Sequence, residues 1–405
     1  MEVAQSFAVM PEPPAHLPRS VGDIPDLICI SHLRWAFVFQ RPQHLMTRYA
    51  RNRRVFFVEE PIYDDTPETR ITVEVHDGVH VVVPHLPQGF GATESISAQR
   101  AALEQLIARE RITRYVLWYY TPLALRFSSH LTPVGVAYDC MDELSAFKGA
   151  STELPALERE LLRRADVVFT GGQSLYEAKK GQHPNIHAVP SSVDVAHFAT
   201  ARRPGEDPPD QKPIPHPRLG FFGVLDERLD IPLLQGLADA RPDWQLVMIG
   251  PVVKIDPRDL PRRSNIHYLG AKSYAELPRY IAGWDVALLL FARNEATRYI
   301  SPTKTPEYLA AGKPVVSTSI RDVVSPYGEH GLVYIADTVA DMVRACNAAL
   351  REPAEHRRAR ADAFLTGMSW DRTWSRTASL LDAATATVVP QPPQTAPTVR
   401  AARGA

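Results

Sequence analysis

Short apolar runs alternate with helical patterns along this chain, and one proline-rich polar segment interrupts the alternation. The first series of runs includes DLICIS, YVLWYY and GVAYDC, and the second includes RLGFFGVL, WQLVMIGP and DVALLLF. Apolar runs without strict alternation are typical of parallel strands that helices cover on both faces. The pattern therefore predicts an α/β protein with two doubly wound, Rossmann-like domains.

The segment between the two series, ARRPGEDPPDQKPIPHP, sets the expected domain limits. Its prolines remove backbone donors and hold the chain extended, so it is expected to separate two cores. Ligands of doubly wound domains bind outside the carboxyl ends of the strands, which predicts a site in the cleft between the domains. The expected parts are a disordered N-terminus over 1–22, a first domain over 23–200, a linker over 201–217, a second domain over 218–368, a helix over 369–386 and a disordered tail over 387–405.

Composition excludes several classes of protein. Lys and Arg (45) nearly balance Asp and Glu (46), so no global field attracts nucleic acid, and any anion site must be built locally. The three cysteines, Cys29, Cys140 and Cys346, have neither disulfide-framework nor zinc-site spacing. No signal peptide and no run of 18 apolar residues is found, which predicts a soluble cytoplasmic protein.

The stretch SPTKTPEYLAAGKPVVST, residues 301–318, predicts a short buried helix. Thr305 is expected to cap a helix whose first residue is Pro306, because proline there loses only a donor that the helix cannot use. Gly312 is expected to end the helix in a left-handed conformation, and Pro314 to prevent its resumption.

The same stretch carries groups that suit a phosphorylated ligand. Lys304 adds a positive charge, and Ser301, Thr303 and Thr305 add hydroxyls near the helix start. Glu307 would repel phosphate but can accept hydrogen bonds from the vicinal hydroxyls of a ribose. The combination predicts a nucleoside diphosphate that carries a further group. Alternatively, Glu307 only interacts with its own helix dipole and Lys304 is solvated.

Four stretches resemble GT-B glycosyltransferases, particularly the large retaining family 4. ADVVFTGGQSLYEAKKGQHPNIHAVPSSVDVAHF resembles the family's hinge region, LGFFGVLDERLDIPLL its phosphate loop, residues 301–318 its donor-binding helix, and MSWDRTWSRTASLL its late helix. The resemblance covers about residues 25–385. It implies the GT-B fold, with two domains facing a cleft and the helix over 369–386 crossing back onto the first domain.

The phosphate loop matches the family at Gly223 and Arg228, whereas Val224 stands where the family's first cation lies. The resemblance implies that Arg228 and Lys304 stabilise the charge that develops on the leaving diphosphate. It also places Lys272 near the base and diphosphate, although a surface lysine is the alternative. The sequence contains no Asp-x-Asp pair, so metal-independent transfer without a cofactor is expected.

The family's E-x7-E pattern is incomplete here. Glu307 matches the ribose-binding glutamate, but Tyr299 occupies the position of the glutamate that contacts the transferred sugar. The resemblance implies that backbone groups of residues 301–304 take over the sugar contacts. The expected donor-binding residues of this stretch are Ser301, Pro302, Thr303, Thr305 and Glu307.

In the first domain, FQRPQHLM follows the first predicted strand, where the resemblance places a helix start that faces the donor. Arg41, with Gln40 and Gln43, is expected to contact sugar or phosphate, and an ordinary capped helix is the alternative.

Two carboxylates follow the strand GVAYDC. Asp139 is expected to hold an acceptor hydroxyl or act as its base, and Asp142 is expected either to bind substrate or to cap the next helix.

FQRPQHLMTRYA and YDCMDE are most similar to a bacterial subgroup that includes teichuronic-acid-type glycosyltransferases of surface polysaccharides. The expected reaction transfers a hexosyl group from a nucleoside diphosphate sugar to a glycan or lipid-linked acceptor. The alternatives are a nucleotide-sugar epimerase of the same fold and a catalytically silent nucleotide-sugar-binding partner. The basic runs YARNRRVFF and ELLRRADVV either contact the inner face of a membrane or form solvated helix faces.

Overall fold

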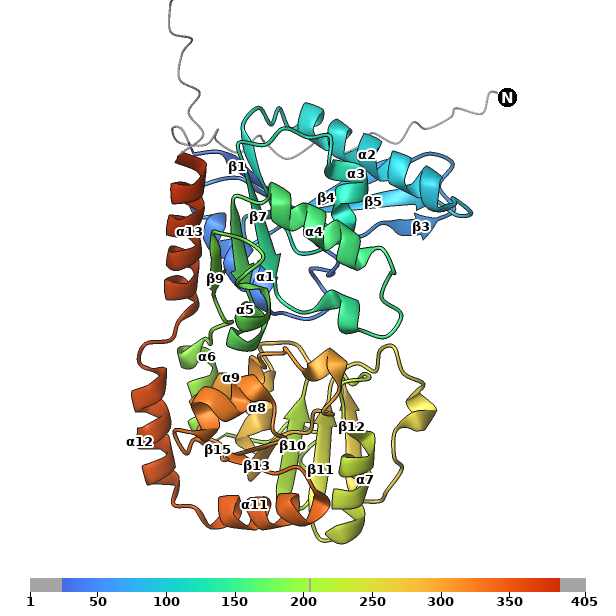
Figure 1. The fold of residues 1–405 in the computed structure, drawn as a ribbon. Coiled ribbons are helices and arrows are strands. Elements are labelled where there is room, and N and C mark those ends of the chain that lie inside the picture. Colours follow the sequence, from blue (N-terminus) through green and yellow to red (C-terminus); the bar gives the residue numbers. More distant parts are fainter. Residues whose placement is uncertain (1–23, 204, 387–405) are drawn as a thin grey trace, which may run out of the picture.

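The computed structural model describes residues 24–203 and 205–386, which form two α/β domains, one above the other in Figure 1. The two expected disordered ends, 1–22 and 387–405, lie outside the described residues. Both domains consist of a mostly parallel sheet between layers of helices, as the alternation of apolar runs predicts. The expected fold class is confirmed.

The first domain is built on a nine-stranded sheet in the order β3-β5-β2-β1-β6-β7-β8-β9, with β4 paired to β5. Only the β4–β5 pair is antiparallel. The strands are β1 (Asp26–Ile30), β2 (Val55–Val58), β3 (Ile62–Asp64), β4 (Arg70–His76), β5 (Val79–Pro87), β6 (Tyr115–Tyr119), β7 (Gly135–Cys140), β8 (Val167–Thr170) and β9 (Ile186–Ala188).

Helices cover both faces of this sheet. Successive residues of β1 alternate between two apolar clusters, because Leu27 and Cys29 belong to one and Ile28 and Ile30 to the other. This explains why the strand reads as a continuous apolar run. The helices are α1 (Arg41–Tyr49), α2 (Ala92–Arg109), α3 (Leu125–Ser128), α4 (Leu154–Arg164) and α5 (Gln173–Lys179), with short 3-10 helices η1 (Pro122–Ala124) and η2 (Leu144–Ala146).

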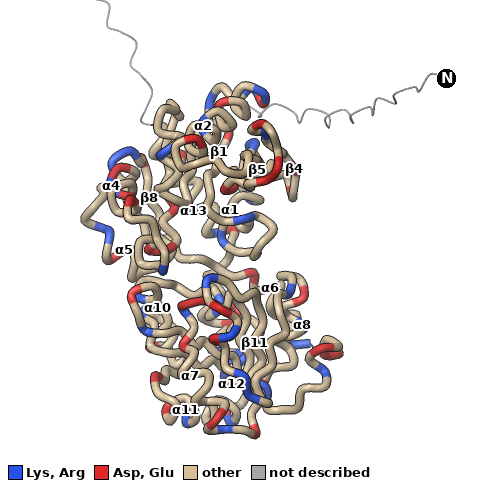
Figure 2. Tube along the Cα trace, turned by 90° about the vertical axis from the view of Figure 1, so that its right-hand side faces the viewer, with Lys and Arg blue, Asp and Glu red and all other residues tan. Residues whose placement is uncertain are grey.

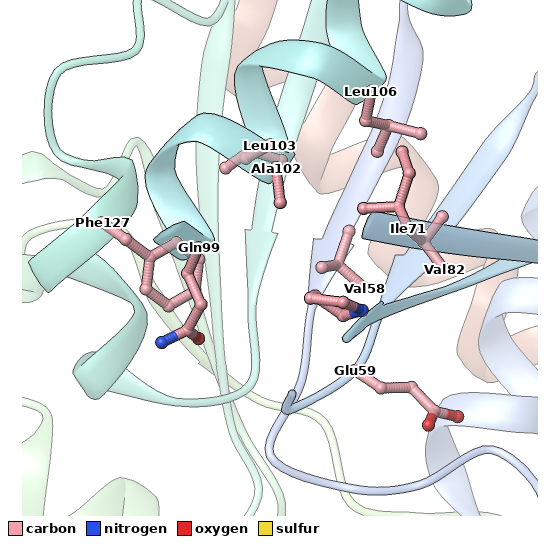
Figure 3. A pocket seen from close by; sticks show the side chains of 10 residues that line it. Val58, Glu59, Ile71, Val82, Gln99, Ala102, Leu103, Leu106 and Phe127 are labelled. Atoms are coloured by element: carbon pink, nitrogen blue, oxygen red, sulfur yellow. The ribbon is translucent and has the colours of Figure 1, made fainter. Parts of the chain in front are cut away.

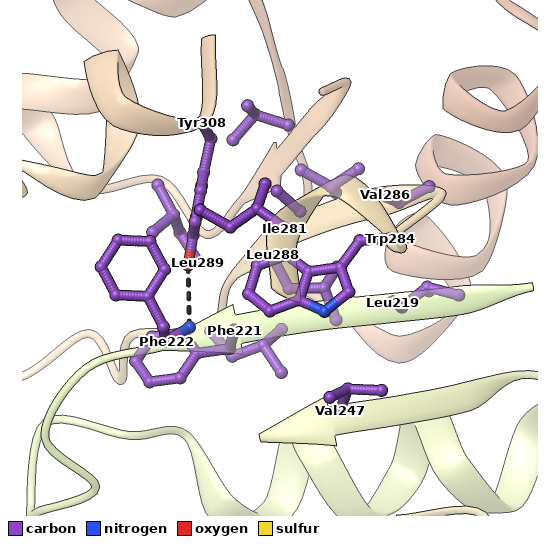
Figure 4. Close-up of a cluster of buried hydrophobic side chains, with 14 of the residues drawn as sticks. Leu219, Phe221, Phe222, Val247, Ile281, Trp284, Val286, Leu288, Leu289 and Tyr308 are labelled. Atoms are coloured by element: carbon purple, nitrogen blue, oxygen red, sulfur yellow. Dashed lines mark hydrogen bonds between the residues drawn. The ribbon is translucent and has the colours of Figure 1, made fainter. Parts of the chain in front are cut away.

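The second domain has a six-stranded parallel sheet in the order β12-β11-β10-β13-β14-β15. Its core packs Trp284 against Gly220, where a Cβ atom would lie 2.0 Å from the indole ring. The hydroxyl of Tyr308 accepts a hydrogen bond from the backbone N–H of Phe222 at 3.0 Å (Figure 4). The strands are β10 (Arg218–Phe222), β11 (Gln245–Ile249), β12 (Ile266–Gly270), β13 (Val286–Leu289), β14 (Val315–Ser317) and β15 (Val333–Ile335).

The remaining helices surround the second sheet or lead back to the first domain. The α-helices are α6 (Val195–Ala199), α7 (Ile231–Ala240), α8 (Leu277–Ala282), α9 (Lys304–Ala310), α10 (Arg321–Val323), α11 (Val339–Arg351), α12 (Ala354–Leu365) and α13 (Trp370–Ala386). The shorter segments are η3 (Thr200–Arg202), η4 (Pro257–Asp259), η5 (Glu295–Thr297) and the π-helical η6 (Val324–Gly328).

The proline-rich segment 201–217 packs on the second domain rather than standing apart from both cores. Ile214 belongs to the second-domain apolar cluster. Gln211 is fully buried, donates to the carbonyl of Tyr280 at 2.9 Å and accepts from Nε1 of Trp284 at 3.0 Å. Phe198 belongs to the same cluster, so the change of core lies between β9 and α6, before the expected boundary at residue 200.

Helix α13 crosses back onto the first domain, as the resemblance implied (Figure 1). Leu381 is fully buried in an apolar cluster of the first domain. The Tyr49 hydroxyl on α1 donates to Oγ1 of Thr377 at 3.0 Å, and Arg48 pairs with Asp371 at 3.1 Å. The last described helix therefore completes the core of the first domain.

Charges of both signs are interspersed over the two domains (Figure 2). In the first basic run, Arg51 pairs with Asp371 and Arg54 with Asp26, and in the second run Arg163 and Arg164 both pair with Glu160. Ion pairs therefore compensate part of the positive charge of each run. Within residues 24–203 and 205–386, every helix is too short or too polar to cross a bilayer.

Candidate functional site

The end of β10 meets the start of α9 on the side of the second domain that faces the first. Gly223, which follows β10, has a φ of 141°, a conformation that favours glycine. A Cβ atom there would lie 2.2 Å from Cε and 2.7 Å from Nζ of Lys304. The lysine side chain therefore lies directly against the Gly223 backbone, and a larger residue would displace it. The sequence-predicted phosphate loop and lysine are thus brought together.

Lys304 and Glu307 form an electrostatically coupled pair one helical turn apart on α9. Burial and, to a smaller extent, the charge of Arg228 lower the pKa of Lys304 to about 8, while Glu307 opposes the shift. Burial raises the pKa of Glu307 to about 8 against the opposing charge of Lys304. Both groups are therefore poised to change charge near physiological pH, and a charged ligand would decide their protonation states.

Helix α9 begins two residues earlier than expected. Its first residue is Lys304, and Thr303 occupies the N-cap position without a side-chain cap. Thr305, the expected cap, lies inside the helix, where its buried Oγ1 makes no hydrogen bond among the described residues. Pro306 is tolerated because its missing N–H would lie in the first turn in either register. Gly312 ends the helix with a φ of 73°, as predicted.

Arg228 lies at the boundary between the domains. Its guanidinium pairs with Asp226 at 2.7 Å and lies 5.6 Å from the ring centre of Phe147, which belongs to the first domain. Nζ of Lys254 lies 4.9 Å from the same ring. The sequence analysis missed Asp226, Phe147 and Lys254. The only signal for Lys254 was its place in the loop after β11, the strand next to β10.

A buried carboxylate lies beside Arg228. Both side-chain oxygens of Glu227 are buried and have no hydrogen-bond partner among the described residues. Such groups are costly to leave unpaired, so hydroxyls of a bound ligand would stabilise this one.

Asp142 is the first-domain residue that the structure brings to these cations. Burial raises the pKa of Asp142, and Arg228, Lys304 and Lys254 oppose the shift. The next helical segment, η2, begins at Leu144 with Glu143 at its N-cap, so Asp142 does not cap it. The substrate-binding interpretation of Asp142 is therefore the one that the geometry favours.

Arg41 and Asp139 form a buried ion pair instead of lining the cleft. Nε of Arg41 donates to Oδ2 of Asp139 at 2.9 Å and to Oδ1 at 3.1 Å, and Nη1 donates to the carbonyl of Val189 at 2.7 Å. Arg41 is 2% exposed and Asp139 is 0% exposed. An acceptor hydroxyl does not reach Asp139 in this arrangement, so the expected acceptor role gives way to a structural one that joins α1, β7 and the end of β9.

Gln40 and Gln43 hold the loop that precedes α1. Oε1 of Gln43 accepts from the backbone N–H of Gln40 at 3.0 Å, and Nε2 of Gln43 donates to the carbonyls of Trp35 at 2.7 Å and Val38 at 3.0 Å. Gln43 is buried and committed to these backbone groups, so it is not available to sugar or phosphate. The ordinary capped-helix alternative holds for Gln43, while Gln40 stays half-buried at the loop.

Lys272 lies with the proline-rich segment and not with the other cations. Its Nζ pairs with Asp210 at 2.6 Å and lies 5.0 Å from the ring centre of Tyr280. Lys272 therefore does not make the expected contact with the base or diphosphate. It interacts instead with Asp210 of the segment 201–217 and with Tyr280 of α8.

The residues before α9 touch the first domain directly. A Cβ atom on Gly172 would lie 2.6 Å from Cβ of Ser301 and 2.3 Å from Oδ2 of Asp322. Oδ1 of Asp322, on α10, accepts from the backbone N–H of Ser174 in the first turn of α5 at 2.9 Å. Tyr299 packs against an apolar cluster of the first domain. Ser301, Pro302 and Thr303 are half-buried.

Aromatic side chains from several elements stack across the domain boundary. Tyr274 stacks on His197 with ring centres 4.3 Å apart and on Phe39 of the first domain at 4.6 Å. His44 on α1 stacks on Trp370 of α13 at 4.3 Å and meets Tyr274 edge-on at 5.6 Å. Tyr274 therefore contacts aromatic residues of both domains.

Among the described residues, no group of three or more His, Cys, Asp or Glu side chains could hold a metal ion. The polar groups that converge between the domains are one buried carboxylate on α9, Asp142, and the three cations Arg228, Lys254 and Lys304. This arrangement can hold an anionic ligand by its charge and a hydroxyl-bearing part by Glu307.

Comparison with known proteins agrees with this geometry. Residues 216–352 match the family model described as glycosyl transferases group 1. A stretch of 257 residues, 58% of the chain, is 26% identical to TuaH of Bacillus subtilis (strain 168), which carries the name of a teichuronic acid biosynthesis glycosyltransferase. The match spans 64% of the length of that curated relative. The expected similarity to a teichuronic-acid-type protein is confirmed.

Solved structures share the whole architecture at low sequence identity. The sucrose-phosphate synthase of Thermosynechococcus elongatus superposes with a TM-score of 0.67 and 14% identity, covering 90% of this chain and 100% of that chain. An E. coli structure described as trehalose-6-phosphate bound with UDP-2-fluoro glucose superposes with a TM-score of 0.66 and 11% identity, covering 90% of this chain and 100% of that chain. The structure of Anabaena HepE in complex with UDP and glucose superposes with a TM-score of 0.62 and 13% identity, covering 89% of this chain and 100% of that chain. The chain therefore has the GT-B fold, and its residues 216–352 are similar to the glycosyl transferases group 1 family.

Proposed function

We propose that this chain is a glycosyltransferase that moves a hexosyl group from a nucleoside diphosphate sugar to a hydroxyl of a glycan or lipid-linked acceptor. The bond from the anomeric carbon to the diphosphate oxygen breaks, and a bond to the acceptor oxygen forms. The acceptor's proton leaves with the nucleoside diphosphate. The group 1 match and the similarity to TuaH support a transferase of cell-surface polysaccharide synthesis that acts on the cytoplasmic side.

The pairing of Lys304 with Glu307 beside Gly223 carries this proposal. A cation alone would suit many anions, and a carboxylate alone would repel phosphate. Together they suit a ligand with a diphosphate at one point and vicinal hydroxyls close by. Ligation by both groups would also remove the cost of burying each charge, because the ligand supplies the missing partners.

The cations of the cleft provide the proposed chemistry. Arg228, Lys254 and Lys304 would stabilise the negative charge that grows on the diphosphate as the glycosidic bond breaks. Asp226 holds Arg228 in position, so this guanidinium is ordered before the donor binds. The proposal includes transfer without a metal ion. It also includes retention of the anomeric configuration, by resemblance to family 4.

Calorimetric titration of the purified chain with UDP, GDP and dTDP tests the donor site. We expect one nucleotide to bind, and Glu307→Ala to weaken its binding by about 10- to 100-fold, the loss of one or more charge-assisted hydrogen bonds. Glu295→Ala is the matched control, because Glu295 is 76% exposed at its side chain and pairs only with Arg298. Equal binding by wild type and Glu307→Ala would overturn the assignment.

A turnover assay with the corresponding nucleotide sugar separates the remaining functions. Release of nucleoside diphosphate with EDTA present supports metal-independent transfer. Conversion of the donor to an isomeric nucleotide sugar without an acceptor would identify an epimerase. Tight nucleotide binding with neither product would identify a silent binding partner.

A further inference from the structure

A cavity of about 300 Å³ opens in the first domain at the carboxyl ends of its central strands. Ser31 follows β1, Glu59 and Glu60 follow β2, and Thr121 follows β6. Because these three strands are neighbours in the sheet, their ends bring the polar groups together. A cavity of this volume is large enough for a small ligand.

The walls combine apolar surface with hydrogen-bonding groups. Ile30, Ile96 and Leu123 supply apolar surface. The hydroxyl oxygens of Ser31 and Thr121 accept from backbone N–H groups at 2.9 and 3.3 Å, which leaves both hydroxyl protons to donate. Apolar faces with donors at the edges suit a sugar ring, whose C–H faces are apolar and whose rim carries hydroxyls.

Glu60 is the lining carboxylate that has no hydrogen bond or ion pair within the described residues. The carboxylate of Glu59 accepts from the backbone N–H of Trp35 at 2.7 Å and from Arg34 at 3.0 Å. Arg126 is neutralised by Glu153, with Nε at 2.8 Å from the carboxylate. The cavity therefore has one excess negative charge, at Glu60.

Glu60 also faces the second domain. The surrounding protein raises the pKa of Glu60 by partial desolvation, and the charges of Arg34 and Lys254 oppose that shift. Lys254 likewise opposes the raised pKa of Asp142, which places Glu60 and Asp142 on the same side of the first domain. Glu60 thus lies within the electrostatic range of Lys254, one of the cations assigned to the donor diphosphate.

A second, much smaller void lies beneath α2 and shares Glu59, Gln99 and Phe127 with the cavity (Figure 3). Leu103 and Leu106 of α2 approach Ile71 and Val82 of the sheet around it, and the Glu59 carboxylate points away. Its volume of about 10 Å³ is that of one water molecule. It cannot take an acyl or polyprenyl chain, so an acceptor would place its sugar, and not its lipid, in this part of the domain.

We propose that the cavity beside Glu60 is the acceptor site and that it takes an uncharged, hydroxyl-rich sugar ring. Glu60 accepts a hydrogen bond from a ring hydroxyl, and Ser31 and Thr121 donate to others. The inference rests on the proposed glycosyltransferase function. A uronic acid or a sugar phosphate is disfavoured at this position, because Arg34 and Arg126 are already paired with Glu59 and Glu153 and Lys254 is assigned to the donor diphosphate, so a second negative charge would meet Glu60. A free glycan and a lipid-linked glycan both present such a ring.

Saturation-transfer difference NMR in the presence of UDP tests the site. The probes are methyl glycosides of glucose, galactose, mannose, N-acetylglucosamine and N-acetylgalactosamine, and those of glucuronic and galacturonic acid. We expect at least one neutral glycoside to bind about tenfold or more tightly than either uronide. Glu60→Ala should weaken that binding about tenfold. Leu123→Trp, which fills the cavity, should abolish it, and Glu74→Ala, an exposed β4 variant, should leave it unchanged.

Stronger binding of a uronide, unchanged binding by Glu60→Ala and Leu123→Trp, or no binding of any probe would overturn the acceptor site. These outcomes differ from failure of the proposed function, in which wild type would not bind a nucleotide. A transfer assay that compares the preferred sugar as a soluble glycoside with the same sugar on a polyprenyl diphosphate distinguishes the two acceptor sources. Melting curves of each variant confirm that it is folded.

Discussion

At the scale of single residues, the site depends on how burial changes ordinary acid–base behaviour. Lys304 and Glu307 are buried and interact electrostatically. Burial lowers the pKa of Lys304 and raises the pKa of Glu307, which favours the neutral form of each. The unliganded protein therefore carries a cost at this position that a diphosphate and a ribose would relieve. Stability and ligand affinity are linked through these two side chains.

The lowered pKa of Lys304 predicts a pH dependence of nucleotide binding. Lys304 is charged below pH 8 and neutral above it, so the affinity for UDP should fall as the pH rises from 7.5 to 9.5. Lys304→Met should bind UDP more weakly and lose this part of the dependence. Isothermal titration across that range measures both effects. An affinity that falls equally in wild type and Lys304→Met would show that another group titrates.

At the scale of secondary structure, apolar periodicity predicted the alternating strands and helices because each strand is covered on both faces. The same periodicity did not predict which side chains from distant parts of the sequence contact each other. Arg41 and Asp139 are 98 positions apart in the chain, and their pairing depends on how α1 is placed against β7. The same limit applies to Lys272, whose partner Asp210 lies in a segment that was read as a linker.

The start of α9 was also predicted wrongly, by two residues. The proline rule predicted a helix starting at Pro306, but proline is tolerated throughout the first turn, and the helix begins at Lys304. This error did not affect the predicted site, because Lys304 and Glu307 both lie on α9. Glu60 carried no local signal, since its significance comes from a cavity that three separate strands form.

The buried pair that joins α1 to β7 gives a prediction for these elements. Asp139→Ala should destabilise the protein by about 3–5 kcal/mol, because Arg41 would keep a buried charge without its partner. Arg41→Met combined with Asp139→Leu should recover much of that loss. Urea unfolding of Arg41→Met, Asp139→Leu and the double variant measures the coupling. A fully stable Asp139→Ala that has lost only transfer activity would restore the acceptor role.

At the scale of the whole molecule, three kinds of contact hold the two domains in their observed orientation. Aromatic rings stack between Phe39 and Tyr274, Phe147 lies between Arg228 and Lys254, and Asp322 caps α5 across the boundary. Apart from the stack, these contacts are small and polar, as is typical of domains that move relative to each other. Opening the cleft would expose the first turn of α5.

Removal of the cap across the boundary should favour an open arrangement. Asp322→Ala should cost about 1 kcal/mol, the usual effect of losing an N-cap, and should raise the radius of gyration measured by small-angle X-ray scattering. Asp322→Asn retains an oxygen that can accept from Ser174 and should resemble wild type. An unchanged radius for Asp322→Ala would show that the aromatic contacts alone fix the orientation.

The return of α13 to the first domain has a consequence for synthesis of the chain. Trp370 and Leu381 fill a cluster whose other members come from α1 and from strands across the sheet of the first domain. During translation, the amino-terminal half must wait for the final helix to leave the ribosome before its hydrophobic interior is complete. The core of the second domain takes its last buried residue, Leu365, from α12, so that domain can be completed before the first one although its synthesis begins later.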